Sequence, residues 1–267
     1  MNAAVNAKTL AQPGLANHPV VTPDRWIAER KKLLAREKEL THLRDQVAAQ
    51  VRALPWVRID KEYVFDTPVG KRTLADLFEG RSQLMVQHFM LGPGWEQGCP
   101  SCSYMADHTD GMNIHLEHRD ITFVAVSRAP LAEIERFHRR MGWKFKWVSS
   151  NGSDFNYDFH VSFTPDEKKK DEVYYNYGLQ GFESEELPGI SVFHKNDKGE
   201  IFHTYSAYRR GVEAMMGAYF MMDLTPKGRD EESLNWGMEW VRHHDRYEPA
   251  PKAKQSAAGH GCCGSHD

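Results

Sequence analysis

The tetrapeptide Cys99-Pro100-Ser101-Cys102 stands where an apolar run gives way to a helical pattern. The run at 83–90 predicts a buried strand, and residues 103–118 predict a helix. A cysteine at such a junction lies at a helix N-terminus, where unpaired N–H groups and the helix dipole favour thiolate over thiol. The second cysteine follows within one turn and can capture whatever the first one attacks. The pattern therefore predicts a reactive dithiol at the end of a central strand.

Two other interpretations of this motif stay open. A CxxC pair can supply half of a zinc site, and the chain holds 14 histidines that could complete it. The remaining cysteines, Cys262 and Cys263, are adjacent in a Gly/His/Ser-rich tail and are weak candidates for a soft-metal site. The pair could also be inert and buried. The redox interpretation is favoured, and no cofactor is expected.

Composition narrows the class of protein. With 267 residues and 40% hydrophobic content, the chain can fold as one large domain or a medium domain with extensions. A net charge of −3 gives no reason to expect nucleic acid or an anionic membrane as partner. No secretory signal or membrane-spanning run is recognisable, and four cysteines are too few for a disulfide scaffold. We predict a cytoplasmic protein.

A long amphipathic helix is predicted over 22–54, with Thr22 as N-cap and Pro23 in the first turn. It follows a disordered N-terminus at 1–21. Its apolar residues fall seven apart, at Trp26, Leu33, Leu40, Val47 and Leu54. Such a stripe either lies against its own domain or forms an association seam. We predict the second arrangement, in a homodimer.

The remainder divides into a domain at 55–247 and a disordered Cys/His/Gly tail at 248–267. The domain has the pattern strand, helix, strand, CxxC helix, strand, helix. An aromatic-rich insertion at about 149–189, a hairpin at 190–205 and helices at 212–222 and 231–243 follow. This order gives an α/β fold: a mixed sheet flanked by helices, with a long N-terminal helix and an insertion before the C-terminal β-hairpin.

The same order resembles the thioredoxin fold. In thioredoxin-like proteins a cis-proline ahead of the hairpin lies against the CxxC sulfurs, and Pro188 occupies that place here. An ordinary loop proline is the alternative.

The chain also resembles a bacterial family of unknown function that is classed as thioredoxin-like and predicted to contain dithiol-disulfide oxidoreductases. The resemblance spans 54–247. It is carried by six segments: Leu54-Pro55-Trp56-Val57, Leu74-Ala75-Asp76-Leu77-Phe78, His88-Phe89-Met90, Cys99-Pro100-Ser101-Cys102-Ser103, Asp154-Phe155-Asn156-Tyr157-Asp158-Phe159, and His203-Thr204-Tyr205-Ser206 with Arg210-Gly211.

Two departures separate the chain from better-known relatives. Eight residues, 91–98, connect the strand to Cys99, more than in thioredoxin, and Pro-Ser replaces Gly-Pro between the cysteines. Peroxiredoxins usually carry Pro-x-x-x-Thr/Ser-x-x-Cys. Here Pro93 lies six before Cys99, and Glu96 replaces the hydroxyl residue.

We therefore predict a dithiol-disulfide oxidoreductase in which Cys99 is the nucleophile and Cys102 the resolving thiol. Its partners would be a protein or small-molecule disulfide or thiol and an external thiol reductant. Trp95 and Tyr104 are candidates for an apolar rim, although aromatic residues so placed are as often core residues. His88 is a candidate for lowering a thiolate pKa, although a lone histidine on an apolar strand is more often a core residue. The rivals are a thiol peroxidase and a non-catalytic metal- or ligand-binding module.

Overall fold

The computed structural model describes residues 15–170, 172–181 and 184–248. An eight-stranded mixed sheet forms its centre, in the order β1-β10-β9-β4-β5-β6-β2-β3. Its strands are β1 (Val57–Arg58), β2 (Val64–Thr67), β3 (Gly70–Thr73), β4 (Gln83–His88), β5 (Ile121–Ser127), β6 (Lys146–Ser149), β9 (Gly189–Lys195) and β10 (Ile201–Tyr208). A separate hairpin joins β7 (Val173–Tyr175) and β8 (Gly178–Gln180).

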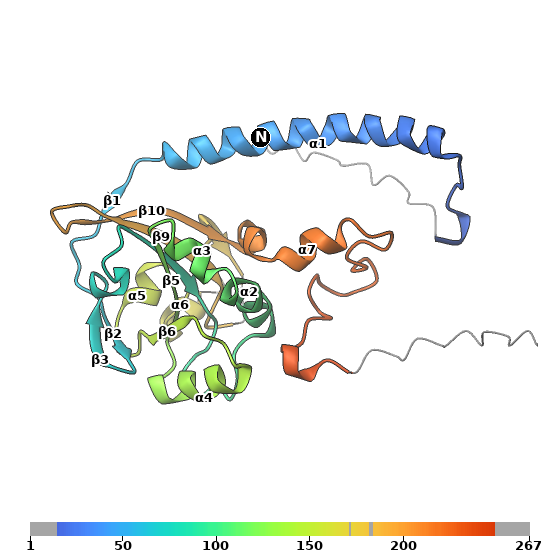
Figure 1. Ribbon diagram of the computed structural model, residues 1–267. Helices are drawn as coiled ribbons and strands as arrows, with labels where there is room; N and C mark the ends of the chain where they lie inside the picture. The colour runs from blue at the N-terminus through green and yellow to red at the C-terminus, as the bar shows by residue number, and fades with distance from the viewer. Residues whose placement is uncertain (1–14, 171, 182–183, 249–267) are drawn as a thin grey trace, which may run out of the picture.

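Helices surround this sheet (Figure 1). The α-helices are α1 (Pro23–Arg52), α2 (Pro100–Asp110), α3 (Asn113–Glu117), α4 (Leu131–Met141), α5 (Phe155–Asp158), α6 (Pro165–Lys168) and α7 (Gly217–Met222). Short 3-10 turns are η1 (Leu15–Asn17), η2 (Asp76–Phe78), η3 (Arg209–Met215) and η4 (His244–Arg246).

Strand β4 holds the centre of the sheet. It pairs in parallel with β5 and antiparallel with β9, so that His88 lies opposite Val126 on one side and Gly189 on the other. The β4–α2–β5 unit followed by the β9–β10 hairpin is a thioredoxin-like arrangement. The predicted fold class is thereby confirmed.

The core has two halves, one on each face of the sheet. Alternate residues of β4 point to opposite faces. Leu84 and Val86 pack in the half that also holds Phe155 of the insertion. Met85 packs in the other half, which includes residues of α2 and α4. The dithiol belongs to this second half.

Helix α1 has the predicted bounds almost to the residue, but none of its residues is buried. Its 30 residues extend about 45 Å. Figure 1 shows it as a separate rod whose C-terminal end leads into β1. The Arg44 guanidinium lies 5.9 Å from the centre of the Phe220 ring of α7. Trp26 and Leu33 are 59% and 55% exposed, so the apolar stripe is left uncovered.

Two helix predictions near the C-terminus were wrong. The helix expected at 212–222 is divided into η3 and α7 at Met216, whose ψ of 71° is not helical. The helix expected at 231–243 is absent, and irregular turns replace it. Left-handed backbone at Asp230 and Met238 interrupts any helical run there. Polar contacts of Glu231, described below, hold these turns.

Candidate active site

The dithiol is placed by the start of α2. Cys99 is the N-cap residue, with φ −58° and ψ 131°, and Pro100 begins the helix. The Cys99 N–H donates to the carbonyl of Met90 over 3.0 Å. The Cys99 carbonyl accepts from the N–H of Ser103, also over 3.0 Å. Gly98 is required just before it, because a Cβ there would lie 2.5 Å from the Phe89 ring. The helix predicted over 103–118 is thus two helices, α2 and α3.

The two thiols differ in exposure and acidity. Cys99 is partly exposed and Cys102 is buried, and both are free. A hydrogen bond from the Cys102 thiol lowers the pKa of Cys99 to about 7, against the opposing effect of burial. The backbone N–H groups of Cys102 and Ser101 add to this stabilisation of the thiolate. Cys99 is therefore the more acidic and the more exposed of the two thiols.

The pKa of Cys102 is shifted in the opposite direction. Its hydrogen bond to Cys99 and its burial raise its pKa well above the usual range, and the negative charge of Glu186 acts in the same direction. The Gln87 side-chain amide donates to the Cys102 carbonyl over 3.1 Å and ties α2 to β4. Cys102 is thus the thiol of the pair that holds its proton more tightly.

A buried ion pair supplies the charge near Cys102. Glu186 accepts from Arg128 Nε and from the Ser162 hydroxyl, each over 2.6 Å. Burial raises the pKa of Glu186, although the Ser162 hydrogen bond and the Arg128 charge oppose that shift. Arg128 also donates to the Tyr157 hydroxyl over 2.9 Å. Tyr157 belongs to one of the segments that carry the family resemblance.

Pro188 lies where the sequence predicted, beside both cysteines on the wall of one cavity. The resemblance implied a cis peptide bond before Pro188, but the described residues contain none, so the alternative of an ordinary trans proline holds. The trans segment is held by contacts on both sides. The Leu187 N–H donates to the Val161 carbonyl over 2.8 Å, and the Tyr175 hydroxyl donates to the Pro188 carbonyl over 2.6 Å.

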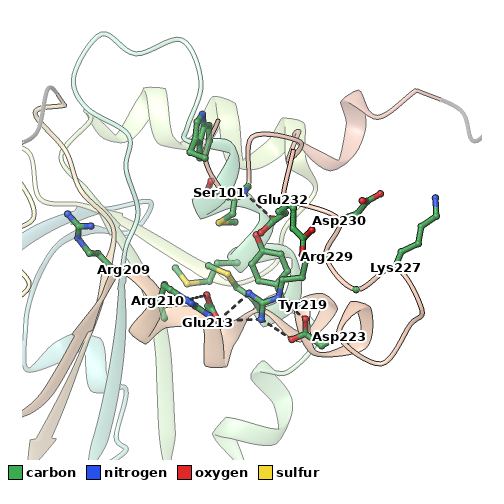
Figure 2. A pocket seen from close by; sticks show the side chains of 18 of the residues that line it. Ser101, Arg209, Arg210, Glu213, Tyr219, Asp223, Lys227, Arg229, Asp230 and Glu232 are labelled. Atoms are coloured by element: carbon green, nitrogen blue, oxygen red, sulfur yellow. Dashed lines mark hydrogen bonds and ion pairs between the residues drawn. The ribbon is translucent and has the colours of Figure 1, made fainter. Parts of the chain in front are cut away.

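The cavity beside the dithiol has a volume of about 1460 Å³. Ser101 lines it together with the two cysteines, and α7, η3 and the irregular segment after α7 form the opposite side. In Figure 2, Glu213, Arg229 and Asp223 lie around the Tyr219 ring, while Lys227 stands away from it. The apolar lining includes Met90, Met105, Val212, Met216, Trp236 and Met238.

A network of polar contacts holds the far wall of the cavity. Arg229 forms ion pairs with Glu213 and Asp223, at 3.4 and 2.9 Å. Its guanidinium lies 4.0 Å from the centre of the Tyr219 ring. Glu231 accepts from the Tyr219 hydroxyl and Trp240 Nε1, each over 2.7 Å, and from the Met238 N–H over 3.1 Å.

Four of the predicted supporting residues do not line this cavity: Trp95, Tyr104, Pro100 and His88. Trp95 donates to Glu185 over 3.3 Å, from the loop before α2. Tyr104 is buried in an aromatic group with Tyr219 and Trp240. Pro100 is exposed at the first position of α2 and serves as a helix start.

His88 is placed on the other face of the sheet. Its ring stacks on Phe159 at 5.7 Å, and burial lowers its pKa to about 3. His88 Nε2 lies 2.8 Å from the Ser191 hydroxyl oxygen, and the hydroxyl oxygens of Ser191 and Ser206 are 2.7 Å apart. The Ser206 hydroxyl oxygen lies 2.7 Å from Nε2 of His203. His88 is therefore a core residue that links three strands.

Sequence reasoning missed most of the cavity. Its methionines come from four separate segments, the β4–α2 loop, α2, the η3–α7 junction and the C-terminal turns. No local spacing connects them. Outside the Cys99–Cys102 tetrapeptide, the segments that carried the family resemblance included two cavity residues, Met90 and Arg210.

The sequence left a metal site as one alternative for the cysteines and predicted no membrane-spanning segment. Within residues 15–170, 172–181 and 184–248, no three His, Cys, Asp or Glu side chains are grouped so as to hold a metal ion. Cys262 and Cys263 lie outside these residues. No helix of the described chain is long and apolar enough to cross a membrane.

The sequence profile of the family described as "Bacterial protein of unknown function (DUF899)" matches residues 15–247. The chain therefore belongs to that family. None of the curated proteins compared with the chain matches it.

Several solved structures are similar in fold. Peroxidoxin BcpB from Mycobacterium tuberculosis is 11% identical, with a TM-score of 0.41 over 62% of this chain and 92% of that one. Peroxiredoxin Q from Xanthomonas campestris is 12% identical, with a TM-score of 0.41 over 58% and 87%. Yeast mitochondrial 1-Cys peroxiredoxin is 17% identical, with a TM-score of 0.35 over 66% and 79%. Likeness at this level says nothing about activity.

Proposed function

We propose that this member of the DUF899 family is a dithiol-disulfide oxidoreductase. The observation that carries the proposal is the placement of the two cysteines: Cys99 is the partly exposed N-cap of α2, and Cys102 follows within the first turn. In this arrangement the pKa of Cys99 is lowered to about 7, with Cys102 as the main cause. A thiol with a pKa near neutral pH combines a large thiolate fraction with good nucleophilicity. Partial exposure of Cys99 leaves that thiolate accessible.

The reaction balances in two exchanges. The Cys99 thiolate attacks one sulfur of a protein or small-molecule disulfide, forms a mixed disulfide and releases the first thiolate. Cys102 then loses its proton, attacks Cys99 and releases the second thiolate, leaving a Cys99–Cys102 disulfide. An external dithiol reductant resets the pair and is itself oxidised. We expect this cycle in the cytoplasm, where such reductants are maintained.

Single-cysteine variants test the assignment of roles. Cys99→Ser should abolish both fast alkylation and disulfide reduction, because it removes the low-pKa thiol. Cys102→Ser should keep fast alkylation but accumulate a mixed disulfide, detectable by intact-protein mass. The matched control is Cys262→Ser/Cys263→Ser, which should keep full activity.

The same assays expose the rival functions. Peroxide consumption without disulfide exchange would assign a thiol peroxidase, although Glu96 stands where a hydroxyl is usual in peroxiredoxins. Full disulfide-exchange activity in Cys99→Ser would overturn the proposal.

A further inference from the structure

We propose that the disulfide reduced by Cys99 belongs to a small molecule that enters the cavity, and not to a folded protein. The inferred substrate has an apolar arm next to its sulfur and no strong net charge. This inference rests on the proposed function and assigns its substrate class.

The first argument is the position of the reactive sulfur. Both cysteines lie on the wall of a cavity of about 1460 Å³, together with Pro188. Ligand cavities for small molecules commonly have volumes of about 300–1000 Å³, so this one can hold such a molecule. A folded protein is too large to enter a cavity of this size, whereas a small disulfide can enter it.

The second argument is that this wall is held in place. Glu231 joins it to α7 through the Tyr219 hydroxyl and fixes its own turns through Trp240 and Met238. Farther along the segment, His243 Nε2 donates to the carbonyl of Gly98 over 2.8 Å, next to Cys99 itself. A large partner that reaches into the cavity would have to displace this segment and break these hydrogen bonds.

The third argument is the chemistry of the lining. Methionine side chains are apolar and adaptable, and four of them line the cavity: Met90, Met105, Met216 and Met238. They would accommodate an apolar arm of variable shape.

The charged residues of the lining nearly balance one another. They comprise four cations, Arg209, Arg210, Lys227 and Arg229, and five carboxylates, Glu213, Asp223, Asp230, Glu231 and Glu232. Glu213 forms ion pairs with both Arg210 and Arg229, as Figure 2 shows. These pairs neutralise much of the positive charge of the two arginines. A strongly anionic or cationic substrate would gain little attraction there.

The experiment compares two disulfides in the full-length Cys262→Ser/Cys263→Ser background, so that the reacting thiols are Cys99 and Cys102. Pre-reduced protein is mixed with 2,2′-dithiodipyridine, which is small, neutral and apolar, or with insulin. We expect rapid reaction with the first and slow reaction with the second. Met238→Asn should slow the dithiodipyridine reaction roughly threefold or more by removing an apolar contact, while alkylation by iodoacetamide keeps its rate.

A second variant tests the wall. Glu231→Ala removes three hydrogen bonds from the wall, and we expect it to raise the rate of insulin reduction roughly tenfold by releasing the segment. The matched control is Glu248→Ala, which removes an exposed carboxylate outside the cavity lining and should leave insulin reduction slow. If Glu231→Ala does not fold, access to Cys99 is measured instead on the protein with the intact wall, with maleimides of two sizes. A 5-kDa polyethylene glycol maleimide should modify Cys99 far more slowly than N-ethylmaleimide.

The outcomes separate the two proposals. Insulin reduction as fast as dithiodipyridine reduction, or size-independent modification of Cys99, would overturn the small-molecule substrate and leave the oxidoreductase standing. No reaction of reduced protein with either disulfide would overturn the oxidoreductase itself, and this inference with it.

Discussion

The hydroxyl of Tyr175 donates a hydrogen bond to the carbonyl oxygen of Pro188 over 2.6 Å. Tyr175 comes from β7 in the insertion, and Pro188 lies on the cavity wall with the dithiol. The same hydroxyl accepts from the Arg209 N–H over 3.4 Å. Arg209 has a φ of 50°, a left-handed conformation that is costly for a residue with a side chain. The insertion therefore supports two parts of the cavity wall.

Removing this hydroxyl should cost both stability and activity. We expect Tyr175→Phe to lower the free energy of unfolding by about 1 kcal/mol, because a buried carbonyl loses its partner. Disulfide reduction should also slow, since Pro188 is less firmly held. Urea unfolding and steady-state kinetics measure the two effects. The exposed neighbour Tyr174 gives the control, and an equal effect of Tyr174→Phe would show that the Pro188 contact is unimportant.

The pH dependence of alkylation should report the thiolate of Cys99. The rate with iodoacetamide should rise with pH through an apparent pKa of about 7, because only the thiolate reacts. Cys102→Ala removes the S–H donor and should move this pKa upward, toward the usual value of about 8.5. Cys102→Ser keeps an O–H donor and should give a smaller upward shift. Identical profiles in the two variants would mean that the hydrogen bond does not set the acidity of Cys99.

The elements that the sequence predicted correctly are those with local signals. The apolar run of β4, the CxxC motif at the start of α2 and the turn between β9 and β10 are each encoded within a few neighbouring residues. The cavity depends instead on contacts such as Glu231 with Tyr219, which no periodicity announces. The pattern at 231–243 was mistaken for a helix because it gave no warning of the left-handed backbone at Met238. His88 was considered for a role beside the dithiol because it ends β4. Successive side chains of a strand point to opposite faces, and the His88 side chain lies on the face away from the dithiol.

Acid should destabilise the fold through His88. Its pKa is about 3 in the folded protein, while an exposed histidine has a pKa of about 6.5. The unfolded chain therefore binds a proton between these values that the folded chain does not, so this contribution to stability is intact above pH 6.5 and falls as pH decreases toward 3. The slope is up to about 1.4 kcal/mol per pH unit.

The test compares wild type with His88→Asn, which keeps a polar group near Ser191 but does not titrate. Urea unfolding between pH 7 and 4 should show a shallower loss of stability in the variant. Parallel pH curves for the two proteins would assign the acid sensitivity to other groups.

The uncovered face of α1 should form a dimer. Trp26, Leu33 and Leu40 are exposed at a seven-residue spacing, which suits pairing with the same face of a second copy. We expect light scattering to give twice the chain mass of 30.7 kDa. Leu33→Glu/Leu40→Glu should shift the protein toward monomer, while Gln46→Glu, on a different face of α1, should not. A wild-type monomer at tens of micromolar would contradict the prediction.

The ion pair of Arg128 and Glu186 should affect both folding and the dithiol. Both residues have buried or nearly buried side chains, and their contact distance is 2.6 Å. Arg128→Met should therefore lower the free energy of unfolding by about 3–5 kcal/mol, because it leaves the Glu186 charge without its cation. The double variant Arg128→Met/Glu186→Gln removes that charge as well and should recover much of the loss.

Glu186→Gln alone provides a readout that a purely structural ion pair would not move. The negative charge of Glu186 helps to raise the pKa of Cys102, so its removal should lower that pKa and favour the Cys102 thiolate. In a Cys99→Ser background that also lacks the tail cysteines, alkylation of Cys102 should then shift to lower pH. Ser162→Ala, which removes a hydrogen bond to the same carboxylate but keeps its charge, is the matched control. A Cys102 profile unchanged by Glu186→Gln would confine the pair to a structural role, because a charge acting on the thiol must alter its titration when it is neutralised.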